Sequence, residues 1–140
     1  MLTSVKNYPV GCQVTQTTAQ RRLLVIDDDH AVLFALKRLF DSPEVEVDTC
    51  DSLESAMLLI DSNCYQLVLT DLCFSETVLD AGIEISAYIK STQPDAKVIL
   101  WTGSEGHSLK EKAKAARVDF FFQKPLSAQI IKSIMENLYF

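Results

Sequence analysis

The sequence predicts an α/β domain in which a parallel sheet of five strands is covered by helices on both faces. Two observations support this fold class. Short apolar runs rich in strand-forming residues alternate along the chain with longer segments whose apolar residues recur at helical spacing. Most of these runs lack the polar alternation of a half-exposed strand, so we expect them to be buried on both faces. Alternation of strand and helix implies parallel strands joined by right-handed crossovers.

Length and composition fit one soluble domain. The chain has 140 residues, of which 48% are hydrophobic and 23% are charged, and this is enough to bury a core without disulfides or metals as supports. Residues 1–20 are polar and lack periodicity, so we expect a flexible N-terminal extension before a domain at residues 21–135. Residues 136–140 resemble most of a protease site used to remove purification tags, and we interpret them as a tag remnant.

The predicted strands are four apolar runs and one short alternating segment. The third run is unbroken, is too short for a typical helix and ends abruptly on Asp71, which is typical of a buried parallel strand. The second predicted strand shows alternation, with Val45 and Val47 on one face. In chain order the five strands are expected at residues 23–26, 44–49, 66–72, 98–101 and 120–122.

The predicted helices follow the strands one by one. Asp29 is expected to cap the first helix, which ends before Pro43, and Asp51 or Ser52 caps the second. In chain order the helices are expected at residues 32–40, 53–60, 81–91, about 109–117 and from 127 onward. The fourth is rich in Lys and Ala and has few large apolar residues, so its packing should be weak and its outer face available.

Charge and cysteine usage exclude several classes of protein. The net charge of −6 argues against nucleic acid as a direct partner, because phosphate backbones require a basic surface. The cysteines show no CxxC spacing and have no paired histidines, so zinc is not expected, and we interpret all four as reduced thiols: Cys12, Cys50, Cys64 and Cys73. No apolar run approaches the roughly 20 residues of a membrane span, and no signal peptide is evident. We therefore predict a cytoplasmic protein without a membrane partner.

Polar side chains stand where four of the predicted strands end. Asp27 and Asp28 follow the first strand, Asp71 ends the third, Thr102 follows the fourth and Lys124 follows the fifth. Taken singly, each has a common explanation as a turn residue, a helix cap or a surface charge. Taken together they are informative, because the carboxyl ends of parallel strands meet at one edge, where open α/β sheets bind ligands.

The chemistry of such an edge follows from its residue types. Clustered carboxylates repel one another unless a cation neutralises them, and oxygen ligands with room for water suit Mg²⁺. A lysine and a hydroxyl add a positive charge and a hydrogen-bond donor for phosphoryl oxygens. The residues therefore predict transfer of a phosphoryl group to a carboxylate.

This order of residues, an acid pair, Asp, Thr and Lys-Pro at successive strand ends, resembles the receiver domain of bacterial response regulators. The resemblance extends from about Arg21 to the last helix and implies a flavodoxin-like fold. It also implies a signalling phosphoacceptor rather than an enzyme with a separate substrate. Such a domain takes a phosphoryl group from a sensor histidine kinase or phosphotransfer protein, catalyses its own phosphoryl transfer and dephosphorylation, and signals by changing conformation.

The resemblance also assigns roles to single residues. Asp71 is the phosphoacceptor, and Asp27 and Asp28 hold Mg²⁺, with Asp28 as the more direct ligand. The backbone carbonyl of Cys73 completes the protein ligands together with Asp71. Thr102 and Lys124 contact the phosphoryl group, and Phe121 is the aromatic switch. A homodimer through the fourth helix, fifth strand and fifth helix is one partnership that the family allows.

The sequence departs from the family pattern in two places. Phe74 and Ser75 stand where a Met-Pro pair is common, and the glycine that usually follows comes late, at Gly82, so the loop after Asp71 is longer than usual. Phe121 lacks the hydroxyl of the commoner tyrosine, so one hydrogen bond of the active arrangement cannot form.

Two other classes share part of the pattern. Asp27 and Asp29 resemble the Asp-x-Asp motif of haloacid-dehalogenase-type phosphatases, in which Asp27 would be the nucleophile. Those enzymes usually need a further acidic motif after the lysine, and here only Glu136 follows Lys124. A flavodoxin-like flavin binder would need a Ser-, Thr- and Gly-rich loop after the first strand, where this chain is acidic.

Overall fold

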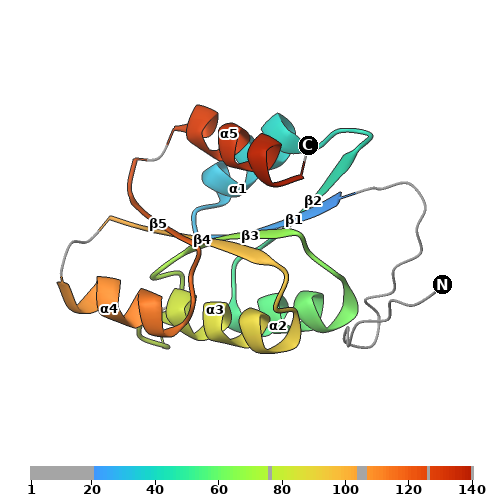
Figure 1. Ribbon diagram of the computed structural model, residues 1–140. Coiled ribbons are helices and arrows are strands. Elements are labelled where there is room, and N and C mark those ends of the chain that lie inside the picture. The colour runs from blue at the N-terminus through green and yellow to red at the C-terminus, as the bar shows by residue number, and fades with distance from the viewer. Residues whose placement is uncertain (1–20, 76, 104–106, 126, 140) are drawn as a thin grey trace.

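The computed structural model describes residues 21–75, 77–103, 107–125 and 127–139 (Figure 1). The strands are β1 (Arg21–Ile26), β2 (Val45–Cys50), β3 (Leu67–Asp71), β4 (Lys97–Thr102) and β5 (Phe120–Gln123). The helices are α1 (His30–Phe40), α2 (Leu53–Ser62), α3 (Ala81–Thr92), α4 (His107–Ala115) and α5 (Ala128–Tyr139). Each predicted element is present, with boundaries that differ by a few residues. The predicted extension at residues 1–20 lies outside the described residues.

All five strands are parallel and pair in the order β2-β1-β3-β4-β5. Helices α1 and α5 cover one face of the sheet, and α2, α3 and α4 cover the other (Figure 1). The predicted fold class is thereby confirmed. The strand order reverses direction between β1 and β3, and a crevice at the carboxyl ends of such strands is where α/β sheets bind ligands.

Side-chain caps begin three of the helices, including α5, where the Ser127 hydroxyl accepts a hydrogen bond of 3.2 Å from the Ile130 N–H. The Asp29 carboxylate accepts a hydrogen bond of 3.0 Å from the Ala31 backbone N–H at the start of α1, as predicted. Ser52 rather than Asp51 caps α2, because its hydroxyl accepts from the Ser55 N–H at 3.1 Å.

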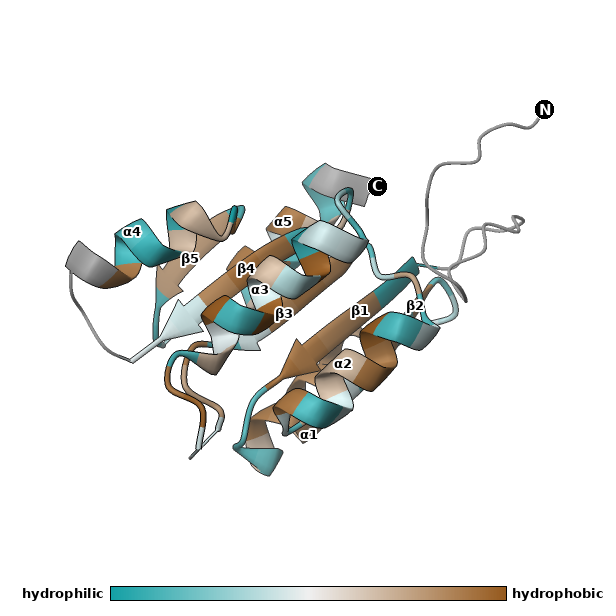
Figure 2. Ribbon diagram, turned by 90° about the horizontal axis from the view of Figure 1, so that it is seen from below, coloured by the Kyte–Doolittle hydropathy of each residue, from teal (hydrophilic) through white to brown (hydrophobic). Residues whose placement is uncertain are grey.

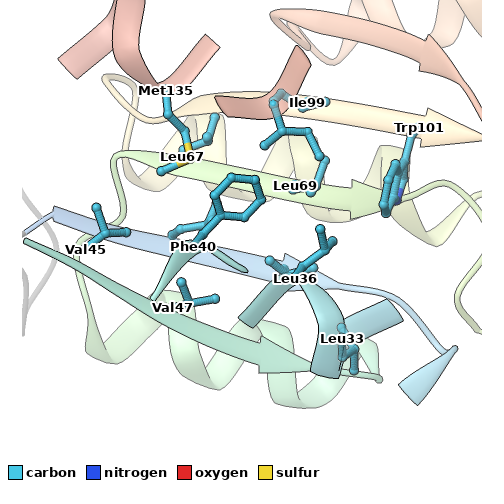
Figure 3. Close-up of a cluster of buried hydrophobic side chains, with 13 residues drawn as sticks. Leu33, Leu36, Phe40, Val45, Val47, Leu67, Leu69, Ile99, Trp101 and Met135 are labelled. Atoms are coloured by element: carbon cyan, nitrogen blue, oxygen red, sulfur yellow. The ribbon is translucent and has the colours of Figure 1, made fainter. Parts of the chain in front are cut away.

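The core on the α1 and α5 face is a single cluster, called here the α1–α5 cluster and drawn in Figure 3. Its strands contribute alternate residues, because side chains on one face of a strand recur every second position. The cluster consists of Leu23, Val25, Leu33, Leu36, Phe40, Val45, Val47, Leu67, Leu69, Ile99, Trp101, Ile131 and Met135. This face is continuous from β2 to β4, so it holds β1 and β3 firmly in place.

The other face carries a second cluster of similar size beneath α2 and α3 and a smaller one beneath α4. The small one, called here the α4 cluster, contains three buried residues, Leu72, Leu100 and Ala113, with Leu109 and Phe121 packed partly buried against it. Figure 2 shows the contrast, because β1 is brown along most of its length while much of α4 is teal. The prediction that the fourth helix packs weakly is consistent with this small core.

Two expectations are modified. Cys64 is disulfide-bonded, so the interpretation of all cysteines as reduced thiols is wrong for this residue, whereas Cys50 and Cys73 are free. Helix α5 extends to Tyr139, and the origin of residues 136–140 as a tag remnant stays a prediction. Among the described residues, none of the helices combines the length and apolar character needed to cross a bilayer.

Candidate functional site

The site lies at the carboxyl ends of β1 and β3. These strands are neighbours, and their register pairs Ile26 with Thr70, so the residues that follow, Asp27 and Asp71, come side by side although 44 positions separate them in the chain. Both belong to the face covered by α1 and α5, because each lies an even number of residues from members of the α1–α5 cluster on its own strand.

Three carboxylates gather there. One oxygen from each of Asp27, Asp28 and Asp71 can be chosen so that all three lie within 4.8 Å of one another. They differ in exposure: Asp27 is fully buried, Asp71 is 7% exposed and Asp28 is exposed. Hard oxygen donors at this spacing fit a divalent cation such as Mg²⁺, with the exposed Asp28 side left open to water.

Backbone contacts hold the first carboxylate in place. Asp27 Oδ1 accepts a hydrogen bond of 2.9 Å from the Asp29 N–H, and the Asp27 N–H donates to the Cys50 carbonyl at 3.2 Å. Asp29 in turn caps α1. The three acidic residues after β1 therefore have different contacts. Asp27 and Asp28 belong to the carboxylate cluster, whereas the carboxylate of Asp29 accepts a hydrogen bond from the first turn of α1.

Lys124 reaches the cluster from the end of β5. Its Nζ lies 3.4 Å from Asp27 Oδ2 and 3.4 Å from Asp71 Oδ2. The Lys124 backbone N–H donates to the Thr102 carbonyl at 2.7 Å, and the peptide bond to Pro125 is cis. The backbone of β5 is thus tied to the end of β4, and one ammonium group bridges two carboxylates from β1 and β3.

The ionisation of the site reflects burial opposed by this ammonium. Burial is the main cause that raises the pKa of Asp27, and Lys124 only partly opposes it. Burial and the neighbouring Asp27 carboxylate raise the pKa of Asp71, against Lys124 and a hydrogen bond from the Cys73 backbone. Burial alone would lower the pKa of Lys124, but the two carboxylates outweigh it and raise the pKa. A further cation would relieve the remaining repulsion.

The remaining predicted residues lie around this centre. Thr102 ends β4 and is 2% exposed, one position beyond Trp101, which pairs with Asp71 in the sheet. Cys73 is exposed, two residues after Asp71. Phe121 lies half-buried on the opposite face and packs against the α4 cluster. The structure therefore brings Asp27, Asp28, Asp71 and Lys124 into one cluster, with Thr102 and Cys73 at its edge and Phe121 beneath α4.

Sequence reasoning missed two residues beside the site. Lys124 Nζ lies 5.2 Å from the centre of the Trp101 ring, a contact whose only signal was a lone tryptophan directly before Thr102. Gly82 packs against β3 so closely that a Cβ there would lie 2.4 Å from the Asp71 carbonyl oxygen. The sequence marked Gly82 only as the glycine that comes late after Asp71, and this close contact was not predicted.

The sequence matches the family described as response regulator receiver domain over residues 23–136. No curated protein matches the chain.

Solved structures share the fold. A CheY-like receiver domain protein from Methanospirillum hungatei JF-1 is 22% identical with a TM-score of 0.76, over 86% of this chain and 94% of that one. A two-component response regulator from Clostridium difficile is 22% identical with a TM-score of 0.76, over 85% of this chain and 95% of that one. The response regulator TrrA from Thermotoga maritima, solved in complex with Mg²⁺ and BeF, is 25% identical with a TM-score of 0.70, over 85% of this chain and 99% of that one.

Proposed function

Because the chain belongs to the response regulator receiver family, we propose that Asp71 takes a phosphoryl group from the phosphohistidine of a partner protein. The partner is a sensor histidine kinase or a phosphotransfer protein. The observation that carries this proposal is the position of Asp71, which ends the central strand β3 within salt-bridge distance of Lys124 and beside two further carboxylates. Asp71 is also the less buried of the two carboxylates that Lys124 bridges.

The transfer needs one carboxylate and one leaving imidazole. A carboxylate oxygen of Asp71 attacks phosphorus, so that an O–P bond forms as the N–P bond of the phosphohistidine breaks. The electron pair of the broken bond stays on the imidazole nitrogen, which leaves as part of the partner. Lys124 is placed to attract the phosphoryl oxygens, and the Thr102 hydroxyl is a hydrogen-bond donor for them. Attack of water on the same phosphorus later restores the carboxylate and releases phosphate.

Mg²⁺ is the proposed cofactor, held by the carboxylates of Asp27, Asp28 and Asp71 and by the Cys73 backbone carbonyl. The fit rests on the donor set, because three carboxylates that repel one another at a water-accessible edge are what a hard cation stabilises. When bound, the ion supplies positive charge that neutralises the phosphoryl oxygens during transfer.

The output is a change around α4. Lys124 and Thr102 would leave their resting contacts for the new phosphoryl oxygens, and Phe121 would repack against the α4 cluster. That cluster contains three buried residues among those described. A change in a few of its contacts would therefore affect a large fraction of the packing that holds α4. Such a change would control the formation of a homodimer through α4, β5 and α5. The proposed location of the protein is the cytoplasm.

The phosphatase alternative is not favoured by the geometry. It needs Asp27 as nucleophile and Asp29 as acid, but Asp27 has no exposed surface and Asp29 caps α1. A buried nucleophile and an acid engaged by a helix cannot easily reach a substrate.

The direct test is intact mass after incubation with acetyl phosphate and Mg²⁺. The wild-type chain should gain one phosphate, and Asp71→Asn should gain none while keeping its circular dichroism spectrum. Glu111→Ala, which removes an exposed carboxylate from α4, is the control and should still gain phosphate. If Asp71→Asn is phosphorylated, the acceptor lies elsewhere, with Asp27 the first residue to examine.

The metal proposal has its own test. Mg²⁺ should raise the melting temperature of the wild-type chain, because it relieves carboxylate repulsion that the unfolded chain largely lacks. Asp28→Ala should remove most of this increase, whereas Glu111→Ala should leave it intact. An undiminished response in Asp28→Ala would contradict the assignment of Asp28 as a ligand.

A further inference from the structure

The Trp101 indole lies against the lysine of the site. Lys124 Nζ is 5.2 Å from the ring centre, within the distance at which an ammonium is attracted to an aromatic face. We propose that Trp101 is a positioning residue, whose ring holds the Lys124 ammonium beside Asp71, ready for the incoming phosphoryl group. The inference rests on the proposed function and adds a residue to its machinery.

The sheet places the ring beside the acceptor. Asp71 pairs with Trp101, and Trp101 pairs with Phe122 on β5; paired residues of neighbouring parallel strands project to the same face. Lys124 follows Phe122 by two positions and so continues the same face. Figure 3 shows Trp101 at the end of the α1–α5 cluster toward the carboxyl ends of the strands. The ring is therefore a wall of the site as well as a member of the core.

The carboxylates alone do not hold the ammonium tightly. Both Nζ–oxygen distances are 3.4 Å, longer than the roughly 2.7–2.9 Å of a strong charged hydrogen bond. The Lys124 side chain is flexible, and 32% of it is exposed. A third contact, from a ring that is only 5% exposed and belongs to a packed cluster, restricts where the ammonium can go.

Packing alone does not account for an indole at this position. Its Nε1 is buried and has no hydrogen-bond partner among the described residues, and an unpaired buried N–H destabilises the folded state. Phenylalanine or methionine could fill much of the same space without that penalty. Tryptophan, however, offers the aromatic face that attracts a cation most strongly.

The test is a double-mutant cycle on the rate of phosphorylation by acetyl phosphate with Mg²⁺. Trp101→Met keeps apolar bulk but removes the ring, and should lower the rate about threefold to thirtyfold. In a Lys124→Gln background the same substitution should change the rate less than about twofold, because its effect passes through the ammonium. Trp101→Phe keeps a ring face and should recover most of the rate.

A matched control separates positioning from general loosening of the core. Phe40→Leu removes an aromatic ring from the same cluster, on α1 and away from Lys124, and should leave the rate unchanged. Equal rate losses from Trp101→Met with Lys124 and with Gln at position 124 would overturn the inference, as would a loss in Trp101→Phe as large as in Trp101→Met. If Trp101→Met does not fold, the cycle is run with Trp101→Phe. That variant should then lower the phosphorylation rate by a smaller factor than the one expected for Trp101→Met, and the decrease should be absent in the Lys124→Gln background. If the wild-type chain gains no phosphate, the proposed function itself fails, which is a different result.

Discussion

The α1–α5 cluster and the α4 cluster differ in size although both lie against the same sheet. The first has 13 buried members drawn from two helices and from β1 to β4, and the second has three. The carboxylates of the site stand at the ends of β1 and β3. The side chains of these two strands that face α1 and α5 belong to the α1–α5 cluster. The aromatic Phe121 packs on the second. Asp71, the proposed acceptor, therefore lies on the firmly packed part of the molecule, and Phe121, the proposed switch residue, lies on the loosely packed part.

This division suits a conformational signal. In the proposed function, a phosphoryl group at Asp71 would change contacts near Lys124 and Thr102 without disturbing β3, the strand that carries Asp71. Regions with few buried apolar contacts open at the lowest free energy. The α4 region can therefore rearrange for a small free energy while β1 and β3 remain in place.

The α1–α5 cluster and the α4 cluster share strand β4, and α4 also contacts the segment that follows β3. An ion pair of 2.9 Å joins Lys112 on α4 to Asp80, the residue that precedes α3 with a left-handed backbone (φ 55°). Through Asp80, α4 contacts the segment that follows β3.

The largest expected effect tests the firmly packed cluster. Leu69→Ala in β3, fully buried in the α1–α5 cluster, should lower the free energy of unfolding by about 2–5 kcal/mol, because it leaves a cavity in a packed core. Leu109→Ala, partly buried against the α4 cluster, should lower it by about 1 kcal/mol. Urea unfolding of both variants measures the difference. Equal losses of unfolding free energy in the two variants would mean that α4 is packed as firmly as β3.

A smaller effect is expected at the contact between α3 and the acceptor strand. Gly82→Ala should lower the free energy of unfolding by about 1–3 kcal/mol, because the new methyl group would lie 2.4 Å from the Asp71 carbonyl oxygen and 2.7 Å from the Leu72 Cα. Gly103→Ala, on the segment that leads to α4, meets no atom within 4 Å and should change stability by less than about 0.5 kcal/mol. Thermal unfolding of the pair measures both changes. If Gly82→Ala leaves the free energy of unfolding unchanged, β3 can shift to make room for the methyl group.

The dependence of stability on pH tests the carboxylate cluster, where the firmly packed part is electrostatically unfavourable. Burial raises the pKa of Asp71 in the folded state, so the folded protein binds this proton more tightly than the unfolded chain. The contribution of Asp71 to stability therefore falls as pH rises from its pKa in the unfolded chain, about 4, through its pKa in the folded protein. Asp71→Asn lacks this proton and should gain stability relative to the wild type between pH 4 and pH 7. Urea unfolding with EDTA checks this prediction. If the wild type instead becomes more stable relative to the variant as pH rises, attraction to Lys124 has a larger effect on the pKa of Asp71 than burial.

The smallest effect is expected at the ion pair between α4 and Asp80. Lys112→Ala removes the ion pair with Asp80 and should cost about 0.2–1 kcal/mol, because Lys112 is half exposed and surface pairs are weak. Amide hydrogen exchange in α4 should nevertheless accelerate, since the helix has few other contacts. Lys114→Ala, an exposed lysine of the same helix, controls for the change in helix propensity. Equal exchange in the two variants would rule out Asp80 as an anchor of α4.

Much of the fold and site followed from local patterns. Unbroken apolar runs predicted the buried strands, helical spacing predicted the helices, and Asp29 predicted the start of α1, because these signals depend on residues only a few positions apart. The residues at the strand ends, from Asp27 to Lys124, could also be assigned, since parallel strands bring their carboxyl ends to one edge whatever their order.

Tertiary structure decided what depends on distant pairing. The strand order places β1 next to β3, and with it Asp27 next to Asp71, which no local pattern contains. Asp27 directly follows β1 and is fully buried, whereas Asp28 lies one residue further along the chain and is exposed, a difference that depends on which elements pack around the end of β1. The contact of Lys124 with Trp101 and the fit of Gly82 against the Asp71 carbonyl join segments more than ten residues apart. Such contacts are set by how strands and helices pack together, and packing is a property of the whole chain.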